Sequence, residues 1–97
     1  MIKTFSWAAP TTNVDGSAVT AGEITGYVVS YGAASGVYGT DVAAAADATS
    51  VQIDLAPGTY FAAVKAQSAG GDSAYSNEVQ VSIALPVPSP PTGFLVA

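Results

Sequence analysis

Residues 55–66 read Leu-Ala-Pro-Gly-Thr-Tyr-Phe-Ala-Ala-Val-Lys-Ala. After the Pro-Gly pair, the apolar side chains of Tyr60, Ala62, Val64 and Ala66 fall on every second residue. Successive side chains of a β-strand point to opposite faces, so this alternation predicts a strand with one face toward a core.

Further segments alternate in the same way on both sides of this stretch. In chain order they are Phe5 and Trp7, then Tyr27, Val29 and Tyr31, then Val51, Ile53 and Leu55, and finally Val79, Val81 and Ile83. Pro10 ends the first segment, and residues 69–72 predict a turn before the last one. Residues 41–46 fit either a short edge strand or a loop, because the alanine run is too short for a stable helix. The pattern predicts an all-β fold, an antiparallel β-sandwich.

Composition limits the chemistry that the chain can perform. Its 97 residues, 49% of them apolar, suffice for one domain with its own core. The absence of Cys, His and Arg removes disulfides, the commonest metal ligand and the commonest general base near neutral pH. A net charge of -5 disfavours nucleic acid and anionic membranes as partners. We therefore expect no enzyme activity, catalytic residue, metal or cofactor.

Two motifs suggest more specific chemistry. Asn13, Asp15 and Gly16 fall at the third, fifth and sixth positions of an EF-hand calcium loop, but Thr11 and Gly22 occupy the first and twelfth positions, which need a carboxylate. A loop closed by an Asp-Gly turn is the preferred interpretation. Exposed aromatic residues could form a sugar-binding platform, and the candidates are Tyr38, Phe61, Tyr75 and Phe94. Carbohydrate binding thus stays an alternative without further support in the sequence.

Four segments resemble a known family in order and spacing. Residues 5–10, 24–31, 55–66 and 73–79 look like strands B, C, E–F and G of a fibronectin type III domain, and the match covers residues 2–84. The resemblance implies a core formed by Phe5, Trp7, Tyr27, Val29, Leu55, Tyr60 and Val64. It also implies that Trp7 lies buried at the centre and that the Tyr60 hydroxyl bonds to the backbone of the preceding turn. Lys3 departs from the family pattern, which has an apolar residue there.

A larger departure concerns the family's first strand, strand A, which is missing before Phe5. Residues 88–97 look like that strand with its proline-rich lead-in, so we divide the chain into a sandwich, residues 1–84, and a linker with a strand A-like segment, residues 85–97. A return along strands of nine residues needs about 30 Å, whereas linker 85–91 spans about 20 Å. We expect the segment to complete a neighbouring subunit through Phe94, Leu95 and Val96. A locally permuted monomer and an unstructured tail are the alternatives.

The resemblance extends to fibronectin-like modules on tailed-bacteriophage virions. It implies a non-catalytic capsid or tail decoration or accessory protein that binds other virion proteins or copies of itself. No stretch of sequence matches a signal peptide or a membrane span, so we expect synthesis in the host cytoplasm and a place on the virion. The alternative is an extracellular spacer or glycan-binding module, one piece of a secreted bacterial enzyme or adhesin.

Overall fold

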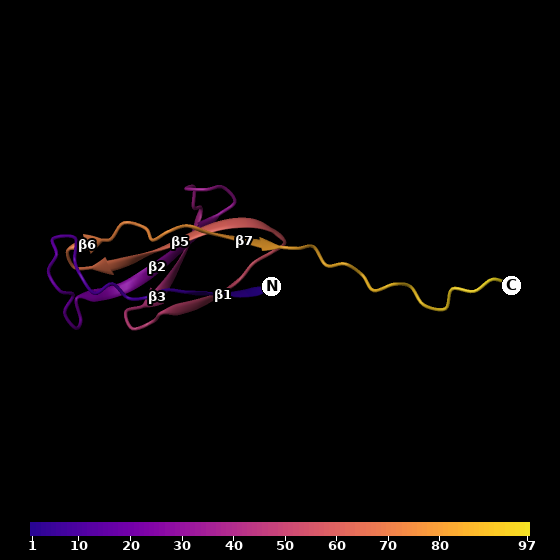
Figure 1. Ribbon diagram of the computed structural model, residues 1–97, viewed down its shortest axis with the longest axis horizontal. Coiled ribbons are helices and arrows are strands. Elements are labelled where there is room, and N and C mark those ends of the chain that lie inside the picture. The colour runs from indigo at the N-terminus through magenta and orange to yellow at the C-terminus, as the bar shows by residue number, and fades with distance from the viewer.

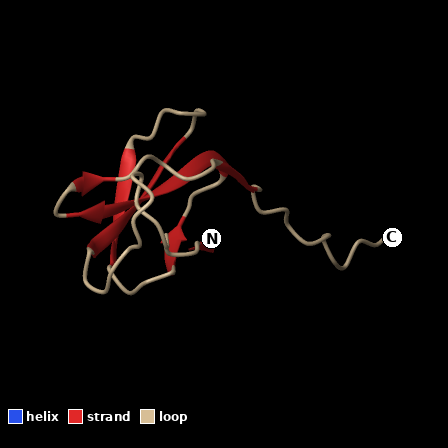
Figure 2. Ribbon diagram, turned by 60° about the vertical axis from the view of Figure 1, so that its left-hand side comes forward, coloured by secondary structure: helices blue, strands red, loops and turns tan.

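The computed structural model describes residues 1–97 and is all-β, with antiparallel strands only. The strands are β1 (Ile2–Ser6), β2 (Ile24–Gly32), β3 (Thr40–Ala45), β4 (Ser50–Asp54), β5 (Gly58–Ser68), β6 (Gly71–Asp72) and β7 (Val79–Ile83). Strands β1 and β4 form a two-stranded sheet. The larger, five-stranded sheet has the order β3-β2-β5-β6, with β7 paired to the other part of β5 (Figures 1 and 2). The chain has no helix long and apolar enough to cross a membrane.

The core lies between the two sheets. Its buried cluster combines Val29 of β2, Ile53 of β4, Ile83 of β7 and Leu55, which follows β4. Tyr27 is also buried, and the partly buried Phe5, Tyr60 and Val64 complete the predicted core set together with Trp7. Burying one such apolar side chain contributes about 1.5–3 kcal/mol, so these positions supply much of the stability of a small domain.

Two local predictions can be compared directly with the strands. Residues 41–46, which fitted an edge strand or a loop, lie in β3 up to Ala45 and pair with β2 from Ser30 to Gly26. The predicted turn at residues 69–72 is a tight connection in which Ser68 pairs with Gly71. The first strand ends at Ser6, earlier than the proline at position 10 suggests.

The Tyr60 side chain anchors the start of β5. Its hydroxyl donates a hydrogen bond of 2.7 Å to the carbonyl oxygen of Ala56, in the turn between β4 and β5. Its ring packs edge-on against Tyr31 at a centroid distance of 6.0 Å. The hydrogen bond expected for Tyr60 is therefore present.

Trp7 differs from its expected place at the centre of the core. Its side chain is only partly buried, although the ring contacts the core cluster and packs against Tyr27 at 5.2 Å. The residue follows the end of β1 and is held by a bond from its backbone N–H to the carbonyl of Thr49. The prediction that Trp7 is buried at the centre of the core was wrong, because one side of the indole borders an open groove rather than another strand.

Residues 84–97 form an extended tail that pairs with no strand. Figure 1 shows the tail leaving the body in the direction in which β7 runs, near the N-terminus, and Figure 2 shows it separate from the sheets in a second view. The molecule measures 79 × 24 × 18 Å with a radius of gyration of 19.3 Å. A compact chain of this length has a radius of gyration of about 13 Å, so the tail adds most of the difference.

Candidate interaction groove

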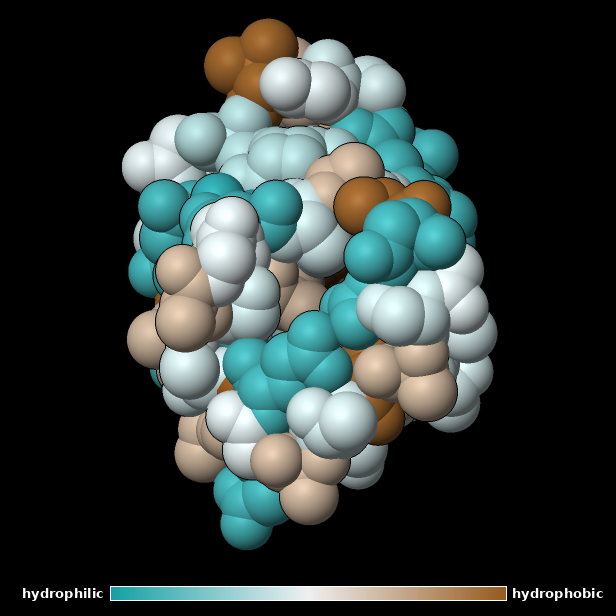
Figure 3. Space-filling view, turned by 90° about the vertical axis from the view of Figure 1, so that its left-hand side faces the viewer, coloured by the Kyte–Doolittle hydropathy of each residue, from teal (hydrophilic) through white to brown (hydrophobic).

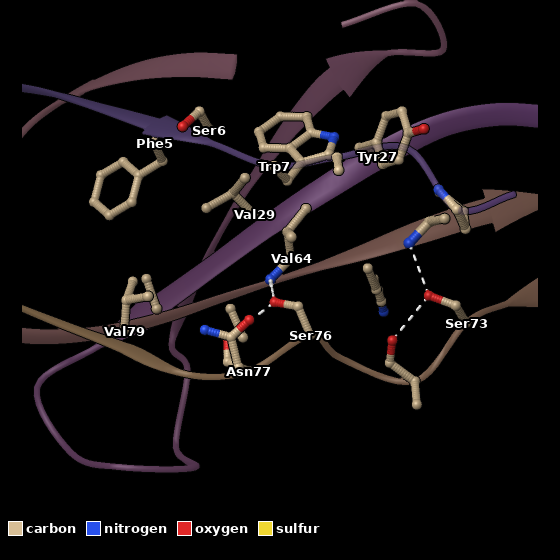
Figure 4. A pocket seen from close by; sticks show the side chains of 17 residues that line it. Phe5, Ser6, Trp7, Tyr27, Val29, Val64, Ser73, Ser76, Asn77 and Val79 are labelled. Carbon is tan, nitrogen blue, oxygen red and sulfur yellow. Dashed lines mark hydrogen bonds between the residues drawn. The ribbon is translucent and has the colours of Figure 1, made fainter. Parts of the chain in front are cut away.

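An open groove of about 450 Å³ lies between β1 and the segment that connects β6 to β7. Figure 4 shows Phe5, Ser6 and Trp7 on one wall and Ser76, Asn77 and Val79 on the other. The floor is formed by side chains of the larger sheet, among them Val29 and Val64. Eleven of its 17 lining residues are hydrophobic, so the groove exposes part of the core to solvent. We call this feature the β1 groove.

The backbone of β1 borders the groove with an unpaired edge. The Met1 carbonyl and the Trp7 N–H both bond to the β4 side, at Leu55 and Thr49. Backbone groups of alternate residues point to opposite edges of an antiparallel strand. The N–H and C=O groups of Ile2, Thr4 and Ser6 therefore point away from β4, and β1 pairs with no other strand. This edge can accept the backbone of a further strand.

The opposite wall is held in place by two serine side chains. Ser76 Oγ accepts a hydrogen bond from the backbone N–H of Val64 at 3.0 Å, and Ser73 Oγ accepts one from Ala66 at 2.9 Å. The backbone N–H groups of the same serines donate to the carbonyls of Val64 and Ala66. Serine oxygens thus replace the carbonyls of a regular strand, so residues 73–78 follow β5 while bulging out of the sheet.

One polar atom beside the groove has no partner. The indole Nε1 of Trp7 is buried and makes no hydrogen bond within the chain. A buried donor without an acceptor costs about 1–3 kcal/mol. The Trp7 side of the groove therefore contains a buried hydrogen-bond donor without an acceptor.

Polar side chains gather on the outer face of the larger sheet. Ser30 is fully buried there, donates to Asp41 Oδ1 at 2.6 Å and shares a hydrogen bond of 3.0 Å with the Tyr75 hydroxyl. Tyr75 packs edge-on against Tyr38, and the ammonium of Lys65 lies 5.3 Å from the Tyr75 ring centroid. Because Tyr75 comes 45 residues after Ser30 in the sequence, strand alternation alone gives no sign of this cluster.

Glu78, directly before β7, holds the loop between β2 and β3 by hydrogen bonds. Its carboxylate accepts hydrogen bonds from Ser35 Oγ at 2.6 Å, from the Tyr38 hydroxyl at 2.7 Å and from the Gly36 N–H at 2.8 Å. These bonds, the one from Ser35 first, lower the pKa of Glu78, and the bond to Glu78 raises the pKa of Tyr38. Ionised Glu78 is thus the form that the fold favours.

We expect acid to loosen this loop in a way that depends on Glu78. Because the pKa of Glu78 is lower in the folded chain than its unfolded value of about 4.3, its stabilising contribution is complete above that value. The contribution is lost as the pH falls through the folded pKa. Asp15 and Glu23, whose pKa values are lowered by bonds from Ser17 and Thr20, act in the same direction.

Thermal unfolding midpoints measured at a series of pH values for the native chain and for Glu78→Gln test this. The amide keeps one oxygen acceptor and cannot ionise, so the midpoint of the variant should fall less steeply below about pH 4 than that of the native chain. Equal slopes for the two proteins would show that the Glu78 bonds contribute nothing to acid sensitivity.

The two motifs with more specific chemistry are accounted for by local hydrogen bonds. In residues 11–16, the Gly16 N–H bonds to the Asn13 carbonyl, and Asp15 Oδ1 accepts both the N–H and the hydroxyl of Ser17. A group of three or more metal-binding side chains does not occur. Of the candidate sugar-binding rings, Tyr38 and Tyr75 come together, but they meet edge to face at 74° with both hydroxyls engaged. This pair therefore presents no shared flat surface for a sugar ring.

The residues predicted to bind a partner lie far from the groove within the same chain. Phe94, Leu95 and Val96 are 97%, 88% and 97% exposed near the end of the tail. The residues that sequence reasoning missed are those of the groove wall at residues 73–78 and of the Glu78 cluster. The serines at positions 73 and 76 were part of the resemblance, but nothing in the pattern indicated that their hydroxyls bond to β5.

Comparisons of the chain with protein-family models, with curated proteins and with solved structures find no match. The resemblance to fibronectin type III domains consequently rests on the four sequence segments.

Proposed function

We propose that the chain is a non-catalytic structural module that binds another protein through the β1 groove. The observation that carries the proposal is the combination of an unpaired strand edge with an apolar cleft beside it. An added strand would gain main-chain hydrogen bonds from the edge and apolar contacts from the cleft. Exposed edges of this kind are usually covered in native proteins.

We further propose that the two sheets are a fibronectin type III-like sandwich, in which β1 takes the place of the family's second strand, strand B. The Tyr60 hydrogen bond and the order of the strands along the chain support this, as do the four sequence segments. The biological setting that fits such a module is a bacteriophage virion, as a capsid or tail decoration or accessory protein. Support for the virion comes from the sequence resemblance and from the low share of charged residues, 9% of the chain, which suits close packing against other proteins.

Particle binding tests the proposed function. Recombinant chain should sediment with purified virions of the phage that encodes it, and the same particles should contain the native chain by mass spectrometry. Val79→Lys places a charge on the groove wall and should weaken binding by about tenfold or more, since burying an unpaired charge is costly. Val87→Lys, which makes the same change on the exposed tail, is the matched control.

Virions that lack the chain and do not bind it would contradict the virion assignment. Equal binding by Val79→Lys and the native chain would contradict the role of the groove. Binding to a polysaccharide that is lost in Tyr38→Ala would favour the alternative of a glycan-binding module.

A further inference from the structure

We infer that the β1 groove receives residues 93–97 from the tail of a second copy of this chain, so that copies join head to tail. This inference rests on the proposed function and names the partner of the same groove. The tail ends in a short apolar segment, in which Phe94 and Val96 would point to one face of a strand and Leu95 to the other. All three side chains are exposed in the free chain, so they are available to a partner.

The groove is specific to one edge of the small sheet. Both β1 and β4 have an unpaired edge, but the lining residues include Phe5, Ser6 and Trp7 and none from β4. A strand beside β1 would therefore place its inward side chains against the apolar floor at Val29 and Val64. Phe94 and Val96 have the chemistry for these positions.

Direction also favours a second copy. Figure 1 shows that β1 starts at the tail end of the body and runs toward the opposite pole, where the β5–β6 turn lies. A strand antiparallel to β1, like every other pairing in the fold, must therefore enter at that opposite pole. Figure 3 looks onto this pole, where hydrophilic loops surround isolated apolar side chains. The groove shares Pro10, Ala66 and Ser73 with a second, mostly polar depression there, which gives an approaching segment a way in.

Length alone does not keep the tail from its own groove, which corrects the sequence-based argument. From Ile2 to Trp7, six residues, the edge formed by β1 and Trp7 is about 20 Å long rather than 30 Å. Residues 85–91 span about 20 Å as a polyproline helix. The linker could therefore reach back along the body.

Stiffness, however, opposes that return. Every residue from 85 to 91 is a proline or directly precedes one, and both positions are restricted to extended conformations. Insertion into the same body needs a sharp reversal at Ala84 and a second one near Gly93. A second copy placed beyond the tail end, with its loop pole toward the first, receives the segment with no reversal at all. The chain should then form linear, heterologous assemblies.

A mixing experiment tests the proposal. A chain ending at residue 92 has the groove but no donor segment. Thr4→Pro keeps the donor and removes a backbone N–H on the free edge of β1, while the bonds to β4 stay. Each protein alone should sediment as a monomer, and an equimolar mixture should form a one-to-one dimer. Thr4→Val, which keeps the N–H, is the matched control and should associate like the native chain.

Donor variants test the orientation of the segment. Phe94→Ser and Val96→Ser should weaken association of the native chain by roughly tenfold to a hundredfold, because each removes one buried apolar side chain. Leu95→Ser, on the opposite face, should change it by less than about threefold. If Thr4→Pro fails to fold, Val79→Lys replaces it as the protein with a blocked groove.

Two outcomes would overturn the proposal. The first is a native chain that sediments as a monomer at every concentration. The second is a monomer whose thermal midpoint falls in Phe94→Ser independently of concentration, which would show insertion into the same body. If either occurs while particle binding still depends on Val79, the proposed function stands and the groove takes its strand from another protein.

Discussion

Replacing Leu55 by alanine should lower the free energy of unfolding by about 2–5 kcal/mol. Leu55 is 2% exposed and belongs to the buried cluster with Val29, Ile53 and Ile83, which joins the two sheets. Truncation removes apolar area from this contact and leaves a cavity that strands on both sides cannot easily fill. Against a total stability of about 5–15 kcal/mol for a domain, the loss is large.

The measurement is urea denaturation followed by fluorescence of Trp7, the only tryptophan in the chain. Leu85→Ala is the matched control, since it makes the same truncation at a residue that is 74% exposed on the tail. Its effect should stay within about 0.5 kcal/mol. A Leu55→Ala midpoint equal to that of Leu85→Ala would mean that the two sheets do not share the core described here.

Replacing Trp7 by alanine should cost less, about 1–3 kcal/mol, although tryptophan is the larger side chain. A fully buried tryptophan loses about 3–5 kcal/mol on truncation, but one side of this ring faces the β1 groove. The packing against Tyr27 at 5.2 Å and the contact with the core cluster are what the variant loses.

The variant Trp7→Phe separates the contribution of the aromatic ring from that of the indole N–H donor. Phenylalanine keeps an aromatic ring beside Tyr27 and removes the Nε1 atom that has no acceptor, so the two effects oppose each other. We expect thermal unfolding of Trp7→Phe close to that of the native chain. A loss larger for Trp7→Ala than for Leu55→Ala would return Trp7 to the centre of the core and contradict the open groove.

The sequence predicts the faces of the strands well because alternation is a local property. Tyr27, Val29 and Leu55 are buried as expected, and the Tyr60 hydroxyl bonds to the turn directly before its strand. Trp7 shows the limit of this reasoning. Its position on the inward face follows from the alternating pattern. Whether that face is covered depends on which strand lies beside β1, and strand pairing is a tertiary property that a local pattern does not contain.

The same limit explains the residues that went unnoticed. Ser30 falls on the outward face of β2, where a serine is expected to contact water. It is buried because Tyr75, from a distant part of the chain, lies over it and bonds to it. Glu78 likewise bonds to residues 40 to 43 positions away, in a loop with no regular pattern. Polar contacts of this kind arise from the tertiary arrangement and leave no periodic signal.

The direction in which the tail leaves has a mechanical consequence. Because residues 84–97 continue the line of β7, a force applied at the C-terminus acts along that strand (Figure 1). Hydrogen bonds of an antiparallel pair lie perpendicular to the strands, so tension loads the β5–β7 ladder in shear, from Gly58–Ile83 to Ala62–Val79, all at once. Shear must break these bonds together, whereas peeling would break them one by one. A pull on the tail therefore loads the β5–β7 ladder in shear and does not peel it open.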